Sequence, residues 1–197
     1  MKSRAFIAAS FSLFLTAAAA TLHAAPADEA QARLRSAVND VLAVTSKAGS
    51  KSALTASVSP VLRRHISFET MTRRAVGLGW RTFKPDEQAK AVQLFSTLVI
   101  RTYANKFTPG EQPQIQYKAA TSPAAGRVDA PTTLVYQGSR YSVTYRMEQA
   151  GGSWLITDVV IEGVSMIANY RSQLDSVYKK GGAQAVITSL QQSVAKQ

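Results

Sequence analysis

The chain has 197 residues and a formal charge of +11 at pH 7, and it contains no cysteine and only two histidines. Its length suits one domain with a hydrophobic core. The missing cysteines exclude a disulfide scaffold and Cys–His catalysis, and with so few histidines a zinc site is not expected.

Residues 1–24 resemble a cleaved secretory signal. Lys2 and Arg4 precede an uncharged, apolar run that ends in small residues, as in a signal with a basic start and a cleavage site. We expect cleavage after Ala24, with Ala20 as the second choice; an uncleaved membrane anchor is the alternative. Export without disulfides favours a bacterial periplasm.

The expected mature chain would keep a charge of +9, because removal of residues 1–24 takes away only Lys2 and Arg4 among the charged side chains. An exported protein meets little nucleic acid. Anionic lipid head groups or an acidic protein surface are therefore the expected counterparts of this charge.

The first half of the mature chain has helical periodicity. One helix is predicted from Asp28 to Lys47. A second helical region runs from Ser52 to Trp80, and we expect breaks near Pro60 and again at Gly77 and Gly79.

The clearest predicted helix runs from Pro85 to about Phe107. Proline suits a first helical position, and Asp86 and Glu87 place negative charge where the helix dipole favours it. Its expected inner face consists of Val92, Phe95, Leu98, Val99, Thr102 and Tyr103.

From Gln114 the hydrophobic period changes to two, which predicts four half-buried antiparallel strands. Hairpin turns are expected at residues 137–139 and 150–152, and the fourth strand covers residues 153–162. Two further helices follow, separated by Gly181 and Gly182. The predicted fold is α+β, with a four-stranded antiparallel curved sheet and helices before and after it, in one domain over residues 25–197.

Few residues suggest catalysis. His65 is the only histidine after the signal and no G-x-S-x-G motif accompanies it, so we interpret it as an ordinary helix-end residue. Asp158 and Glu162 would share one strand face about 13 Å apart, beyond the roughly 5–9.5 Å of glycosidase carboxylate pairs. Gly77 to Trp80 lacks the third glycine of a dinucleotide loop and is interpreted as a helix terminus.

A basic cluster falls within residues 63–84. It consists of Arg63, Arg64, Arg73, Arg74, Arg81 and Lys84, and Glu69 is the one acid among them. It is either a solvated helical face or an electrostatic guide toward anionic head groups or an acidic partner. The candidates for partner or head-group contact are Arg73, Arg74, Arg81 and Lys84.

The helix expected after Gly163 carries a stripe of neutral polar residues, namely Ser165, Asn169, Ser172, Gln173 and Ser176. Ser165 is a plausible helix cap. A merely solvated face would usually be charged, so we interpret the stripe as a clamp that holds this helix against the sheet or the preceding helices.

Four stretches carry a family resemblance: FETMTRRAVGLGWR, FSTLVIRTYA, WLITDVVIEGVSMIANYRSQL and GGAQAVITSL. They resemble the MlaC family, the periplasmic phospholipid shuttle of the Mla lipid-asymmetry pathway, also called the toluene-tolerance auxiliary family. The resemblance implies an NTF2-like cone with an apolar cavity for the acyl tails of a glycerophospholipid. It also implies exchange with an outer-membrane lipoprotein–porin complex and with an inner-membrane ABC transporter that has an MCE-domain subunit.

One turn departs from the family pattern, and the resemblance leaves a second class of lipid cargo open. The QGSR turn after Val135 is shorter than expected for the family, and hopanoid cargo is an alternative to phospholipid. The carrier is expected to be a monomer without catalytic residues, metal or cofactor. A small NTF2-like exported enzyme and an interaction module without cargo are the competing interpretations.

A soluble carrier must enclose both tails of its lipid, so large or aromatic side chains on inward faces are the natural cavity candidates. The candidates for lipid contact are Leu98, Tyr103, Val143, Tyr145, Met147, Met166 and Tyr170.

Overall fold

The computed structural model describes residues 25–197, so the predicted signal segment lies outside the described residues. The helices are α1 (Pro26–Thr45), α2 (Lys51–His65), α3 (Phe68–Val76), the 3-10 helix η1 (Gly77–Thr82), α4 (Pro85–Ala104) and α5 (Met166–Ala195). The strands are β1 (Gln114–Tyr117), β2 (Thr121–Ala124), β3 (Arg127–Tyr136), β4 (Ser139–Ala150), β5 (Ser153–Ile161) and β6 (Val164–Ser165). Within this part of the chain, no helix is both long and apolar enough to cross a membrane.

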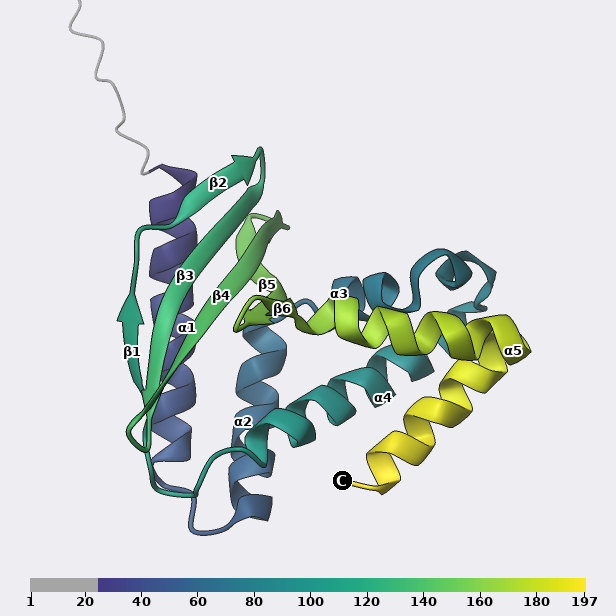
Figure 1. The fold of residues 1–197 in the computed structure, drawn as a ribbon, viewed down its shortest axis with the longest axis horizontal. Coiled ribbons are helices and arrows are strands. Elements are labelled where there is room, and N and C mark those ends of the chain that lie inside the picture. The colour runs from purple at the N-terminus through teal and green to yellow at the C-terminus, as the bar shows by residue number, and fades with distance from the viewer. Residues whose placement is uncertain (1–24) are drawn as a thin grey trace, which may run out of the picture.

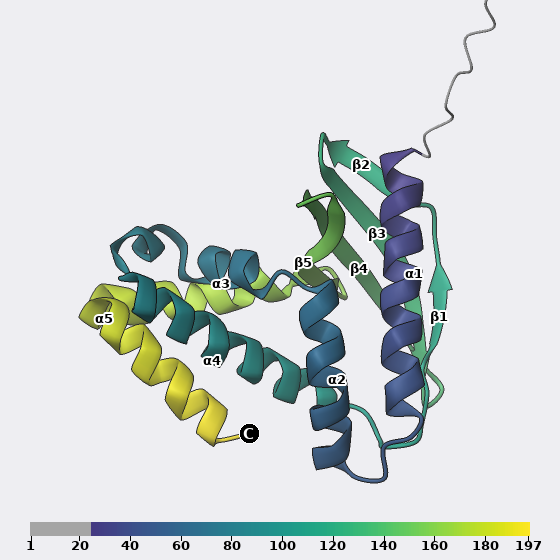
Figure 2. The same cartoon turned by 180° about the vertical axis from the view of Figure 1, so that it is seen from behind.

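The elements form a sheet with one helix packed on it and a helical region beside it. Figures 1 and 2 show α1 against one face of the sheet, while α3, η1, α4 and α5 extend away from it, with α2 between the two regions. The predicted α+β fold with an antiparallel sheet is confirmed. The sheet has six strands in place of four, because two short strands, β2 and β6, pair with β3 and β5.

The strand order is β1-β3-β4-β5-β6, and two tight hairpins set its register. Gln137 and Gly138 join β3 to β4, and Gly151 and Gly152 join β4 to β5, all four with positive φ. Two-residue turns of this hand match the twist of paired strands. Both predicted hairpins are confirmed.

A bulge in β5 changes which side chains face the core. Arg146 pairs with Asp158 but Met147 pairs with Ile156, so Thr157 is the extra residue. Thr157 and Asp158 are both buried, although simple alternation would expose one of them. The bulge therefore brings a carboxylate into the interior.

The predicted break near Pro60 is wrong. Pro60 lies inside α2, which is continuous to His65 and buries Leu54, Val58 and Val61. Pro60 is exposed, so its ring meets solvent and the missing N–H costs one helical hydrogen bond without ending the packed helix. The break comes at Ile66, where the chain forms a parallel bridge with Ile156 and then starts α3.

The predicted helix terminus at Gly77 is confirmed, and it forms a rigid corner against α5. Gly77 has a φ of 74° and ends α3. At Gly79 a Cβ atom would lie 2.7 Å from the ring of Tyr178, so only glycine allows α5 to approach this closely. The Tyr178 hydroxyl also lies 2.9 Å from Thr82 Oγ1.

Asp158 fixes the start of α5 to the sheet. Its Oδ1 accepts hydrogen bonds from the Val159 N–H at 2.8 Å and the Ile167 N–H at 3.1 Å. Its Oδ2 accepts from Ser165 Oγ at 2.6 Å and from Arg146 Nη1 at 3.2 Å. Ser165 in turn caps α5 by accepting from the Ala168 N–H, as predicted. One buried carboxylate thus joins β5, the β6 turn and α5.

Replacement of Asp158 by Asn should destabilise the protein by about 2–4 kcal/mol, because an amide group cannot accept all four hydrogen bonds and leaves buried donors unpaired. Urea unfolding followed by circular dichroism would measure the loss. The control is Asp175→Asn, which removes an exposed ion pair with Lys179 and should cost less than about 0.5 kcal/mol. Equal effects of the two substitutions would contradict the anchoring role.

Candidate functional site

The inner face of β4 carries three of the predicted cavity residues. Val143 and Met147 are buried and Tyr145 is half-buried, and on β3 they lie opposite Thr132, Val128 and Ala130 respectively. Helix α1 contributes buried residues of its own, including Leu34, to the core beside the sheet. The alternation of β4 therefore points these three side chains to the helix-covered side of the sheet.

Tyr145 is half-buried, and protein atoms exclude much of the water around it. Desolvation, followed by the nearby Tyr117, raises the pKa of Tyr145 to about 12. The side chain nevertheless keeps part of its accessible surface, and so does that of Tyr117. Tyr117 and Tyr145 are therefore neighbours on the inner face of the sheet, and each contacts both protein and solvent.

Tyr117 belongs to this site, although the sequence did not single it out. Its ring lies under the guanidinium of Arg35, which is 3.9 Å from the ring centroid. The alternation of β1 was the available signal, since it places Tyr117 on the inward side.

The other four cavity candidates lie where α4 meets α5. Leu98 and Met166 are buried, whereas Tyr103 and Tyr170 are half-buried. Burial is the main cause that raises the pKa of Tyr103, and Tyr170 and Asp158 add to it. Burial also raises the pKa of Tyr170, against a smaller lowering by its hydrogen bond with Thr102. Tyr103 and Tyr170 are thus close neighbours on the two helices.

The structure brings most of the seven candidates into one apolar cluster. Leu98, Met147 and Met166 belong to the main core, and the three tyrosines pack against it as partly buried residues. Val143 is buried but lies outside this cluster. A surface groove of about 810 Å³ lies elsewhere, between α2 and α4, and none of the seven candidates lines it.

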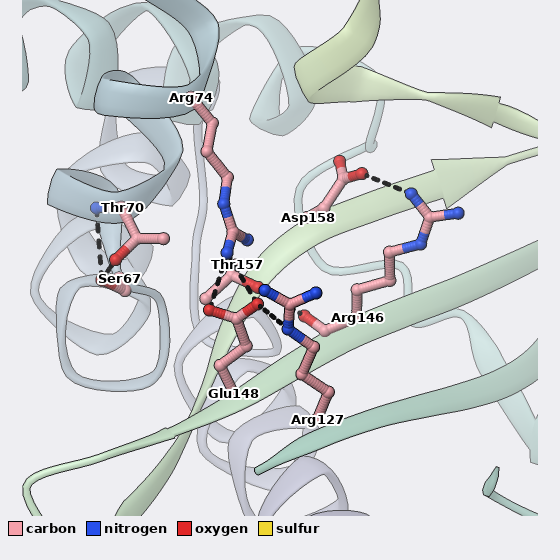
Figure 3. A network of polar contacts seen from close by, with 8 residues as sticks. All are labelled: Ser67, Thr70, Arg74, Arg127, Arg146, Glu148, Thr157 and Asp158. Atoms are coloured by element: carbon pink, nitrogen blue, oxygen red, sulfur yellow. Dashed lines mark hydrogen bonds and ion pairs between the residues drawn. The ribbon is translucent and has the colours of Figure 1, made fainter. Parts of the chain in front are cut away.

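The four basic candidates do not form one free patch. Arg74 donates to both carboxylate oxygens of Glu148, at 2.6 and 2.7 Å, and Arg127 Nε lies 3.2 Å from the same carboxylate (Figure 3). Arg74 is therefore already engaged in tying α3 to β4. Arg73, Arg81 and Lys84 are exposed, and their contact with a partner or a lipid head group stays a prediction.

The predicted clamp on α5 is wrong. Asn169, Ser172, Gln173 and Ser176 are exposed, and Asn169 makes its side-chain hydrogen bond only to Gln173 within the same helix. Only Ser165 of this stripe joins α5 to another element, through Asp158. The prediction fails because a neutral polar stripe can face solvent as well as protein, and the sequence does not show which side of α5 packs.

The residues weighed for catalysis have structural surroundings. Asp158 is fully occupied by its four donors, and Glu162 lies beyond the end of β5, at a φ of 48°, where it accepts a hydrogen bond from the Ser142 N–H. His65 ends α2 as predicted, but it is buried and its Nε2 lies 2.7 Å from Asp40 Oδ2. Residues 25–197 contain no group of three or more potential metal ligands.

Comparison with known proteins places this geometry in a family. The family model described as MlaC protein matches residues 33–192. A solved structure of a phospholipid-binding protein from Ralstonia solanacearum, in complex with a phospholipid, is 26% identical with a TM-score of 0.78. That similarity covers 85% of this chain and 98% of that chain. No curated protein matches the chain. Because the family model spans well over half of the sequence, in a fold shared with that structure, the chain belongs to the MlaC family.

Proposed function

We propose that this protein carries glycerophospholipid through the periplasm as a non-enzymatic shuttle that helps to maintain outer-membrane lipid asymmetry. Residues 1–24 would be removed on export, and residues 25–197 would form one lipid-binding domain that acts as a monomer. The observation that carries the proposal is the similarity, over 85% of the chain, to a protein whose structure contains a phospholipid.

The proposed exchange partners are an outer-membrane lipoprotein–porin complex and an inner-membrane ABC transporter with an MCE-domain subunit. Family membership supports this assignment. Exposed Arg73, Arg81 and Lys84 would guide the carrier to anionic head groups or acidic surfaces at these membranes.

A carrier of this kind must keep both acyl tails away from water. Two tails contain about thirty methylenes, and at about 0.8 kcal/mol each their exposure would cost on the order of 20 kcal/mol. Adsorption of one tail to the surface would not suffice. The tails are proposed to contact the inner face around Tyr145, with Leu98, Tyr103, Val143, Met147, Met166 and Tyr170 as the other wall residues.

The partly accessible tyrosines support this location. Tyr103, Tyr117, Tyr145 and Tyr170 each pack against the core while keeping accessible surface. Aromatic walls with a polar hydroxyl suit a site that is apolar inside and hydrated near its rim.

Protein purified from the periplasm of a Gram-negative host should bring phospholipid with it. Native mass spectrometry should show a lipid-sized adduct, and extraction followed by tandem mass spectrometry should identify a two-tailed glycerophospholipid. Extraction of a hopanoid would support the alternative cargo, and protein that is lipid-free under gentle conditions would contradict the carrier.

Enlargement of the side chain at the inner face should displace the lipid. Tyr145→Trp should lower the copurified lipid about tenfold, because the larger ring takes space that the tails need. The matched control is Thr144→Trp, because the neighbouring residue points to the opposite face of β4. Equal lipid content in both variants, with both correctly folded by circular dichroism, would argue against a site on this face.

Tyr145 also predicts a pH dependence of stability. Its pKa of about 12 in the native state exceeds the value of about 10 expected in the unfolded chain. The stabilisation is therefore complete below pH 10 and is lost as pH rises toward 12, because the unfolded chain gives up the proton first. Tyr145→Phe should reduce this loss by about 1 kcal/mol at pH 11, measured by urea unfolding. Identical alkaline profiles for the two proteins would refute the assignment.

A further inference from the structure

The groove between α2 and α4 is built from two regular rows of side chains. Lys51, Thr55, Ser59 and Arg63 follow one another every fourth residue along α2, and Thr97, Arg101 and Asn105 do so along α4. At 1.5 Å per residue, the α2 row is about 18 Å long. Ala56 and Ile100 add apolar surface between the rows.

The groove is positively charged. The side chains of Lys51, Arg63 and Arg101 line it and none of the lining side chains is acidic, so the terminal carboxylate of Gln197 is the one negative group among the lining residues. Among the described residues, these three cations make no ion pair. Two of them also contact uncharged groups, since Arg63 lies over the Phe68 ring and Arg101 donates to the Val194 carbonyl.

The surrounding segments reinforce this charge. Helix α2 has no Asp or Glu, α4 has none after Glu87, and the chain has none after Asp175. These acid-free segments are far apart in the sequence, yet Gln197 at the end of the chain lines the same groove as α2 and α4. Their positive charges therefore act together on whatever enters the groove.

The shape favours a protein segment over a membrane surface. A bilayer is flat on this scale and cannot fill a groove, whereas a helix of about 12 residues has the length of the α2 row.

We propose that this groove docks an acidic segment of a partner protein, with carboxylates that face Lys51, Arg63 and Arg101 and small apolar side chains that face Ala56 and Ile100. This site is separate from the proposed lipid site, because none of the seven cavity candidates lines the groove. A variant can therefore lose peptide docking and keep its lipid, or lose its lipid and keep peptide docking.

The test uses the isotope-labelled chain 25–197 and a synthetic helical peptide of about 16 residues, with Glu at every fourth position next to Ala and Leu. Amide resonances of residues 51–63 and 97–105 should shift and saturate as peptide is added. Affinity should fall with added salt, and the same peptide with Lys in place of Glu should not bind.

Two variants separate docking from folding. Lys51→Glu combined with Arg63→Glu should weaken peptide binding at least about tenfold. Thr55→Trp should do the same by filling the groove without a change of charge. The control, Lys118→Glu, alters an exposed cation outside the groove and should bind nearly as well as the parent protein. All variants should keep their lipid content and their melting temperature.

Equal peptide affinity in the groove variants and the control would overturn the proposal, as would resonance shifts confined to other surfaces. Binding of the parent protein to vesicles rich in phosphatidylglycerol, lost in Lys51→Glu with Arg63→Glu while the peptide fails to bind, would also overturn it and assign the groove to membranes. Loss of lipid with retained peptide binding would refute only the carrier.

Discussion

The buried carboxylate of Asp158 is the constraint on which the arrangement of sheet and helices depends. A charge in the interior is costly unless donors surround it, and Asp158 has four, from β4, β5, the β6 turn and α5. The bulge at Thr157 turns it inward, and Ser165 links it to the cap of α5. The long C-terminal helix therefore leaves the sheet in a fixed direction and meets α4, where the tyrosines of the proposed site lie.

A second set of contacts fixes the first half of that helix, before its kink at Gly181 and Gly182. Gly79 allows Tyr178 to pack directly on the η1 backbone, and Arg171 packs against Gly77 at the end of α3. The segment of α5 that carries Met166 and Tyr170 is therefore held at its start by Asp158 and farther along by Arg171 and Tyr178. The half-buried tyrosines Tyr103 and Tyr170 pack against the core beside these fixed elements. In the proposed function they would form part of the wall around the acyl tails.

The charged side chains fall into two groups, one paired within the fold and one that lines the groove between α2 and α4. Arg74, Arg127 and Glu148 neutralise one another and join α3 to the sheet. Lys51, Arg63 and Arg101 line the groove and form no ion pair with an Asp or Glu of residues 25–197. The positive charge is therefore of two kinds: Arg74 and Arg127 are paired with an acid, whereas the three groove cations lie where segments without Asp or Glu meet.

Local chemistry in the sequence determined the helices, the hairpins and the inward side of β4. Alternation set Val143, Tyr145 and Met147 on one face, glycines with positive φ set the turns, and Ser165 was recognisable as a cap. These features depend on near neighbours, so one sequence suffices to predict them. Tertiary structure alone decided that α2 continues through Pro60, that a bulge buries Asp158, that Arg74 pairs with Glu148 and that the polar stripe of α5 is exposed. Each of these features depends on contacts between residues that are distant in the chain. The free energy of such contacts exceeds the conformational preference of the local sequence, and the contacts leave no periodic pattern from which they could be predicted.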